Sequence, residues 1–131
     1  MNLDELHLYF CRINWQVTQQ LLELLKEKTL LKRLSLVKAN LNGITMQTIA
    51  EILGKARSLT DLDISWNEIK AKDMIELVEM IGLNRKLVNL NLGWNGLVRV
   101  SAPENEKDIY LKEQEEVLLK LSTFIKHNKN L

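Results

Sequence analysis

The sequence has little of several residue types: one cysteine, one proline and five glycines in 131 residues, with only 5% aromatic residues. A single cysteine, Cys11, excludes an internal disulfide framework and favours a reducing compartment, so we expect an intracellular, cytoplasmic protein. The N-terminal segment carries acids among its apolar residues, which does not fit a secretory signal. No uncharged stretch approaches the ~20 apolar residues that span a bilayer, so no membrane insertion is expected.

The charge is nearly balanced, with 18 Lys and Arg against 17 Asp and Glu. No overall field therefore favours nucleic acid or an anionic membrane surface, and we expect neither as a partner. A chain of this length is normally one domain with a core of its own, here residues 1–131.

What the sequence does contain is a 28-residue repeat. Leu87, Leu90, Leu92, Asn95 and Leu97 lie at offsets 0, 3, 5, 8 and 10 of a unit. The same offsets recur in units that start at residues 3, 31 and 59, and all sixteen aliphatic positions of the four units are aliphatic. Each unit begins with strand-like alternation and continues with helical spacing, which predicts parallel strands on one side, helices on the other and a core between them.

This pattern, L-x-x-L-x-L-x-x-N/C-x-L over essentially the whole chain, resembles the leucine-rich repeat family. The 28-residue period with a full helix is similar to the ribonuclease-inhibitor-like subclass, whose members are typically intracellular. The resemblance implies an α/β leucine-rich-repeat solenoid, with a curved parallel sheet on the concave side and helices on the convex side. Neither end of the chain looks capped, so we expect a piece of a longer array or ends that partners cover.

The position at offset 8 takes Asn or Cys in that family, and Cys11, Asn67 and Asn95 match it, whereas Ala39 does not. A buried Asn there can pair with the carbonyl and N–H groups that a sharp turn leaves without partners. We therefore expect Cys11, Asn67 and Asn95 to be structural ladder residues, with a locally weaker ladder at Ala39.

The spacing changes after the fourth unit. Leu131 fits the start of a further unit, but it lies 44 residues after Leu87, which is 28 plus 16. The extra residues, about 98–113, contain Pro103, and residues 104–116 hold six acids against two lysines. This composition predicts an extended surface loop before a helix over 116–127. Such a loop is either a solvated connection or an acidic docking element.

The sequence contains partial matches to metal-binding and catalytic motifs, but none is complete. Asp61, Asp63 and Ser65 alternate as in a calcium loop, but the required Gly is Trp66 and the required Glu is Lys72. His7 and Cys11 supply two ligands at most, too few for a zinc site. No spacing marks a nucleophile or a catalytic dyad, so we expect no enzyme, metal or cofactor.

The exposed strand face remains as the candidate site. Phe10, Trp66 and Trp94 recur at one offset with Lys38 between them, so they should line one edge of that face. The other candidate partner-binding residues there are Tyr9, Arg33, Asp61, Asp63 and Asn91. Two interpretations of these rings are open. They pack on one another or on the segment after Leu97, or else they form a binding patch.

The hypothesis that follows is a protein–protein interaction module that binds a protein partner through its concave face. One alternative is a structural segment of a large permanent intracellular assembly. A weaker alternative, from the family resemblance alone, is a GTPase regulator.

Overall fold

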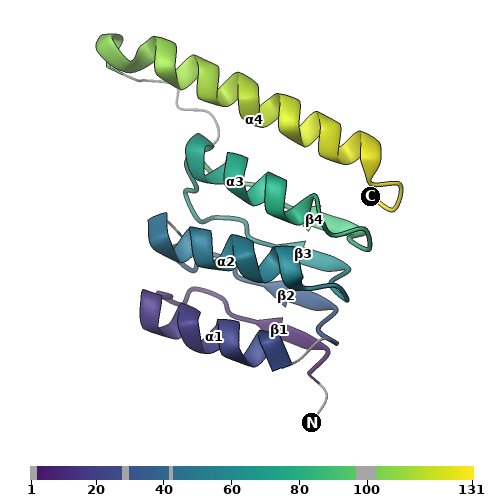
Figure 1. The fold of residues 1–131 in the computed structure, drawn as a ribbon. Coiled ribbons are helices and arrows are strands. Elements are labelled where there is room, and N and C mark those ends of the chain that lie inside the picture. Colours follow the sequence, from purple (N-terminus) through teal and green to yellow (C-terminus); the bar gives the residue numbers. More distant parts are fainter. Residues whose placement is uncertain (1–2, 28–29, 42, 97–102) are drawn as a thin grey trace.

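The computed structural model describes residues 3–27, 30–41, 43–96 and 103–131. Strands and helices alternate along the chain: β1 (Glu5–His7), α1 (Trp15–Glu27), β2 (Arg33–Ser35), α2 (Gly43–Lys55), β3 (Asp61–Asp63), α3 (Ala71–Ile81), β4 (Asn89–Asn91), a 3-10 turn η1 (Glu104–Glu106) and α4 (Lys107–His127). Figure 1 shows each strand followed by a helix in sequence order, with the helices on one side of the sheet.

The four strands form one parallel sheet in the order β1-β2-β3-β4. Their register places Glu5, Arg33, Asp61 and Asn89 side by side, each one repeat unit after the one before. Parallel neighbours need a crossover, and the intervening helix supplies it each time. Positions that share an offset in the repeat therefore become neighbours across the sheet.

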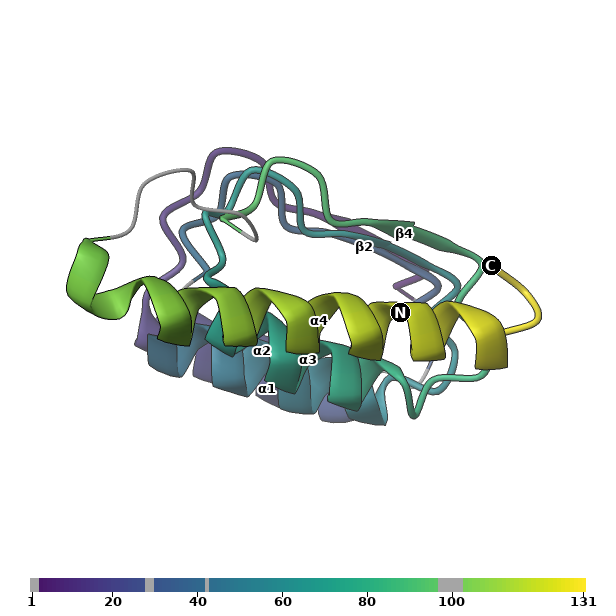
Figure 2. The ribbon, with the colours of Figure 1, turned by 90° about the horizontal axis from the view of Figure 1, so that it is seen from above.

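The core lies between the sheet and the helices, as the view from above shows (Figure 2). The middle residues of the inner strands, Leu34 and Leu62, are 3% and 2% exposed. Leu36 and Ile64, two residues further on, are completely buried. The helices add residues at helical spacing, such as Met74 and Leu77 of α3, which are also completely buried. Truncating one such leucine to alanine would cost about 2–5 kcal/mol.

The segment before the last helix differs from the expectation. Of the predicted insertion 98–113, residues 98–102 lie outside the described part of the chain. From Glu104 on, the chain is helical, and α4 begins at Lys107, so the prediction of an extended loop over about 98–113 is wrong from Glu104 on. No glycine or proline follows Pro103 in this segment, and its Glu, Lys, Gln and Leu residues favour a helix. The helix is anchored on α3 by Val117 and Phe124, which are 1% and 7% exposed.

Within the described ranges, no helix is both long enough and apolar enough to span a bilayer.

Candidate functional site

The turn after each strand has an unusual backbone. Phe10, Lys38, Trp66 and Trp94, which share one offset of the repeat, have positive φ angles of 55°, 51°, 62° and 55°. This left-handed region suits Gly or Asn, and other residues adopt it at a cost of about 1–3 kcal/mol. We call these four residues the aromatic rim. The rim thus occupies a strained conformation in all four turns.

Hydrogen bonds from Asn67 hold the turns together. Its side chain is nearly buried, and its Oδ1 accepts bonds from the N–H groups of Ala39 (2.8 Å) and Leu41 (3.3 Å). Its Nδ2 donates to the carbonyls of Leu36 and Ile64, both at 2.8 Å. One amide therefore satisfies backbone groups in its own turn and in the turn before it.

Asn95 repeats this arrangement one unit later. Its Oδ1 accepts bonds from the N–H groups of Asn67 (3.1 Å) and Ile69 (3.2 Å). Its Nδ2 donates to the carbonyls of Ile64 (3.1 Å) and Leu92 (2.9 Å). These are the bonds of a structural residue, and they fix the backbone that carries Trp66 and Trp94.

Cys11 and Ala39 behave differently. Cys11 is exposed, and its Sγ bonds the carbonyl of Tyr9 in its own turn at 3.3 Å. The first two turns are joined through the backbone, because Ile13 N–H donates to the carbonyl of Ala39 at 3.0 Å. Phe10 N–H donates likewise to the carbonyl of Val37 at 2.9 Å.

The rim side chains form two pairs. Trp66 and Trp94 stack with their ring centroids 4.4 Å apart and an angle of 14° between the planes. They remain 48% and 73% exposed. Lys38 Nζ lies 5.4 Å from the centroid of the Phe10 ring, and that ring is 73% exposed. Thus the two tryptophans pack on each other and still present a large apolar surface to solvent.

Beside the rim, the face of the sheet that points away from the helices is polar, and we call it the open face. This face contains a cavity of about 340 Å³. Three leucines of the strands line it together with eight other residues: His7, Tyr9, Arg33, Ser35, Asp61, Asp63, Asn89 and Asn91. Neighbouring strands are bridged across this face, by an ion pair between Arg33 and Glu5 and by bonds of Asn89 to Asp61 (2.5 Å) and Asn91 to Asp63 (3.0 Å).

These bridges shift the acid–base equilibria of the exposed groups. Hydrogen bonds from Arg33 and then His7 lower the pKa of Glu5 from 4.5 to about 2. The same contact with Glu5 raises the pKa of Arg33. The pKa of Asp61 is lowered by hydrogen bonds from the Thr60 hydroxyl and the Asn89 amide. Glu5 and Asp61 are therefore ionised at neutral pH.

The structure divides the residues proposed from the sequence into two adjoining zones. Phe10, Lys38, Trp66 and Trp94 lie in the rim, and the other candidates line the cavity: Tyr9, Arg33, Asp61, Asp63 and Asn91. Sequence reasoning left out His7, Ser35 and Asn89, although each shares its offset with a chosen residue. Among the described residues, no three His, Cys, Asp or Glu side chains gather as ligands for a metal ion.

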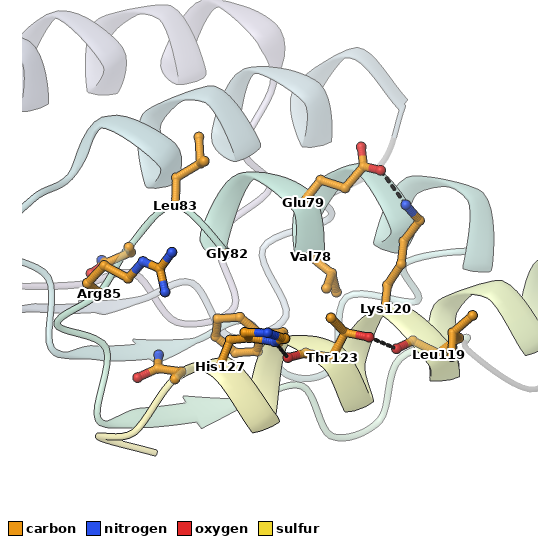
Figure 3. A pocket seen from close by; sticks show the side chains of 12 residues that line it. Val78, Glu79, Gly82, Leu83, Arg85, Leu119, Lys120, Thr123 and His127 are labelled. Carbon is orange, nitrogen blue, oxygen red and sulfur yellow. Dashed lines mark hydrogen bonds and ion pairs between the residues drawn. The ribbon is translucent and has the colours of Figure 1, made fainter.

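A second cavity, of about 430 Å³, lies between α3 and α4 (Figure 3). Lys120 pairs with Glu79 across its edge, which raises the pKa of Lys120. Asn84 borders this cavity, and its side chain donates to the carbonyls of Ala56 and Leu59, both at 3.1 Å. It therefore joins neighbouring units before their strands begin, as Asn67 and Asn95 join them after the strands end. Sequence reasoning missed the role of Asn84, which stands three residues before a unit start.

The architecture is that of a mixed α/β domain, with a four-stranded parallel sheet and leucine-rich-repeat-like units. The sequence matches no protein-family model and no curated protein sequence. Several solved structures share the fold, including the following two. A leiomodin-1 structure described as actin-binding site 2 matches with a TM-score of 0.66 at 17% identity, over 95% of this chain and 80% of the other. The tropomodulin C-terminal domain of Caenorhabditis elegans matches with a TM-score of 0.57 at 11% identity, over 92% of this chain and 87% of the other.

These matches correct the assignment to a subclass. The expected assignment to the ribonuclease-inhibitor-like subclass is wrong, because the similar structures are not arrays of that type. The similar structures are leucine-rich-repeat-like domains of comparable length, 80% and 87% covered by this chain.

Proposed function

We propose that this chain is a protein-binding module, which engages its partner with the aromatic rim and the adjoining open face. In this proposal the sheet is the concave face of a short leucine-rich-repeat solenoid, and the protein acts by binding rather than by catalysis, inside the cell. The likeness to leiomodin-1, whose structure is described as an actin-binding site, makes actin the first partner to test.

One observation carries the proposal: an exposed tryptophan stack on a left-handed backbone. Gly or Asn would occupy the positions of Trp66 and Trp94 with less strain. Keeping two large rings there, 48% and 73% exposed, is costly for folding alone and useful for binding. Trp is enriched among the residues that dominate interface energies.

The geometry also suits binding because it is preorganised. The ring stack contributes about 0.5–1.5 kcal/mol beyond area burial, so both indoles are already ordered in the free protein. The ladder bonds of Asn67 and Asn95 hold the backbone beneath them. A partner therefore meets a surface that loses little conformational freedom on binding.

The test is co-sedimentation with filamentous actin, supported by titration of monomeric actin. Trp66 and Trp94 are replaced together by Asn, which tolerates the left-handed backbone, so that the turn is kept. Trp15, which is 53% exposed at the start of α1 and outside the rim, is the matched control. Binding that is lost in the double variant and kept in Trp15→Asn supports the proposal; binding unchanged in both removes the rim from the interface.

A second candidate function is a structural segment of a permanent assembly. Leu111, Leu118 and Ile125 recur every seven residues on α4 and are 50%, 59% and 57% exposed. A helix face of this kind can pack against a neighbouring helix. If the purified chain sediments as a stable monomer at all concentrations, this candidate loses its support.

A further inference from the structure

We infer that the open-face cavity is a subsite for a basic side chain, arginine or lysine, of the protein partner. This inference deepens the proposed function and rests on it, because it names the chemistry that the partner must present beside the tryptophan rim. It is carried by a buried hydroxyl without a partner, by the charges that surround it, and by the position of the cavity next to Trp66 and Trp94.

The hydroxyl belongs to Ser35 on β2. Ser35 lines the cavity, is 5% exposed, and lies in register between His7 and Asp63. Among the described residues its Oγ has no hydrogen-bond partner. Ser65, by contrast, donates its hydroxyl to Asp63 Oδ1 at 2.7 Å. A buried hydroxyl of this kind is satisfied when a ligand group reaches it, and its lone pairs accept bonds from N–H donors.

The charges around Ser35 select a cation. Arg33 is already paired with Glu5, whereas no ion pair between described residues includes Asp61 or Asp63. The two carboxylates accept bonds from neutral groups instead, the amides of Asn89 (2.5 Å) and Asn91 (3.0 Å) among them. Neutral donors do not cancel the charge of a carboxylate, and only Asp61 is also attracted to Arg33, so an entering ammonium or guanidinium is attracted and a carboxylate is repelled.

The cation belongs at the end of the cavity formed by Ser35 and Asp63, which are in register on β2 and β3. Arg33 is in register with Asp61 at the other end and repels a second positive charge there. Asp61 and Asp63 are two residues apart on β3, so both carboxylates project from the same face of the sheet. The rim shows that a cation can lie over a ring in this fold, since Lys38 does so above Phe10 at 5.4 Å. A basic residue of the partner can thus enter the cavity while its neighbours cover the tryptophans.

The experiment titrates the isotope-labelled full chain with the methylamide of N-acetylarginine, followed by amide chemical shifts. The neutral isostere, the methylamide of N-acetylcitrulline, is the control ligand. The expected result is a saturable shift at Ser35, Asp61, Asp63 and Asn91 with the arginine probe, and affinity lower by about tenfold or more with citrulline. Equal responses to the two probes, or shifts confined to other residues, would overturn the inference.

Asp63→Asn is the decisive variant, because the amide keeps an acceptor for the N–H and hydroxyl of Ser65 while the charge is lost. Asp73→Asn, in the first turn of α3, removes the same charge away from the cavity. The arginine probe should lose about tenfold in affinity with the first variant and keep its affinity with the second. If both variants bind it as the unaltered chain does, the subsite is refuted.

The two proposals fail separately. If the arginine probe binds at Ser35 and Asp63 but actin does not bind, the subsite stands and actin is the wrong partner. If actin binds through Trp66 and Trp94 but the probe does not bind, the rim stands and the subsite is refuted.

Discussion

Trp66 and Trp94 stack with their centroids 4.4 Å apart, although each has a positive φ angle and they are separated by a full repeat unit. The repeat brings them together, since residues one period apart are neighbours across the sheet. The turn then directs both indoles outward. A repeat that exists to build a core thus also builds an exposed pair of rings.

This stack should be visible by circular dichroism. Two indoles at this distance and angle couple their transitions, so we expect an exciton couplet in the far-ultraviolet spectrum. Replacing either Trp66 or Trp94 by Asn should abolish the couplet, whereas Trp15→Asn should leave it. A couplet that persists in the Trp94→Asn protein would contradict the stacking.

The left-handed backbone makes a second prediction. Glu68 is exposed and has a φ of 55°, so Glu68→Gly should be more stable than Glu68→Ala by about 1 kcal/mol. At Lys72, exposed within α3, the order should be reversed by about 1 kcal/mol, because glycine destabilises a helix. Urea unfolding of the four variants measures both differences. If Glu68→Ala were as stable as Glu68→Gly, or more stable, the turn at residue 68 would not be strained.

The ladder makes a third prediction. Asn67→Ala leaves backbone groups of Ala39, Leu41, Leu36 and Ile64 without this partner. Each such buried group costs about 1–3 kcal/mol, so the free energy of unfolding should fall by at least about 3 kcal/mol. Asn89→Ala, on the exposed face, should cost less than about 1 kcal/mol. Similar losses for both variants would show that Asn67 has no special structural role.

The pair of Glu5 and Arg33 predicts a pH dependence. The pKa of Glu5 is lowered from 4.5 to about 2, so its contribution to stability is fully present above pH 4.5 and is lost as the pH falls through about 2. Side-chain carbon NMR should show the low midpoint for Glu5. Arg33→Gln should move that midpoint back toward 4.5. A Glu5 midpoint that Arg33→Gln leaves unchanged would exclude the ion pair.

Much of the sheet could be predicted because its determinants are local and repeated. The leucine spacing predicts strands that are paired one period apart, and the structure pairs Leu6, Leu34, Leu62 and Leu90 in that way. The loop before α4 was harder to predict. A charged segment with helix-forming residues resembles a solvated loop when its anchors, such as Val117, lie only at its far end.

The candidate site was predictable only in outline. The period aligns Phe10, Trp66 and Trp94, but tryptophan does not signal a left-handed turn as Gly or Asn would. The unsatisfied hydroxyl of Ser35 has no sequence signature either, because it depends on which side chains surround it in three dimensions. The subclass was predicted wrongly, because the repeat spacing determines which residues form the core and does not by itself determine the subclass.

The most direct test of the account is the affinity of the full chain for actin with Trp66 and Trp94 both replaced by Asn. We expect a loss of more than about 2 kcal/mol, or about thirtyfold in Kd, with the thermal stability retained. Trp15→Asn should bind as the unaltered chain does. An unchanged Kd for the double variant, with the fold intact, would contradict the central claim that the tryptophan stack anchors a protein partner.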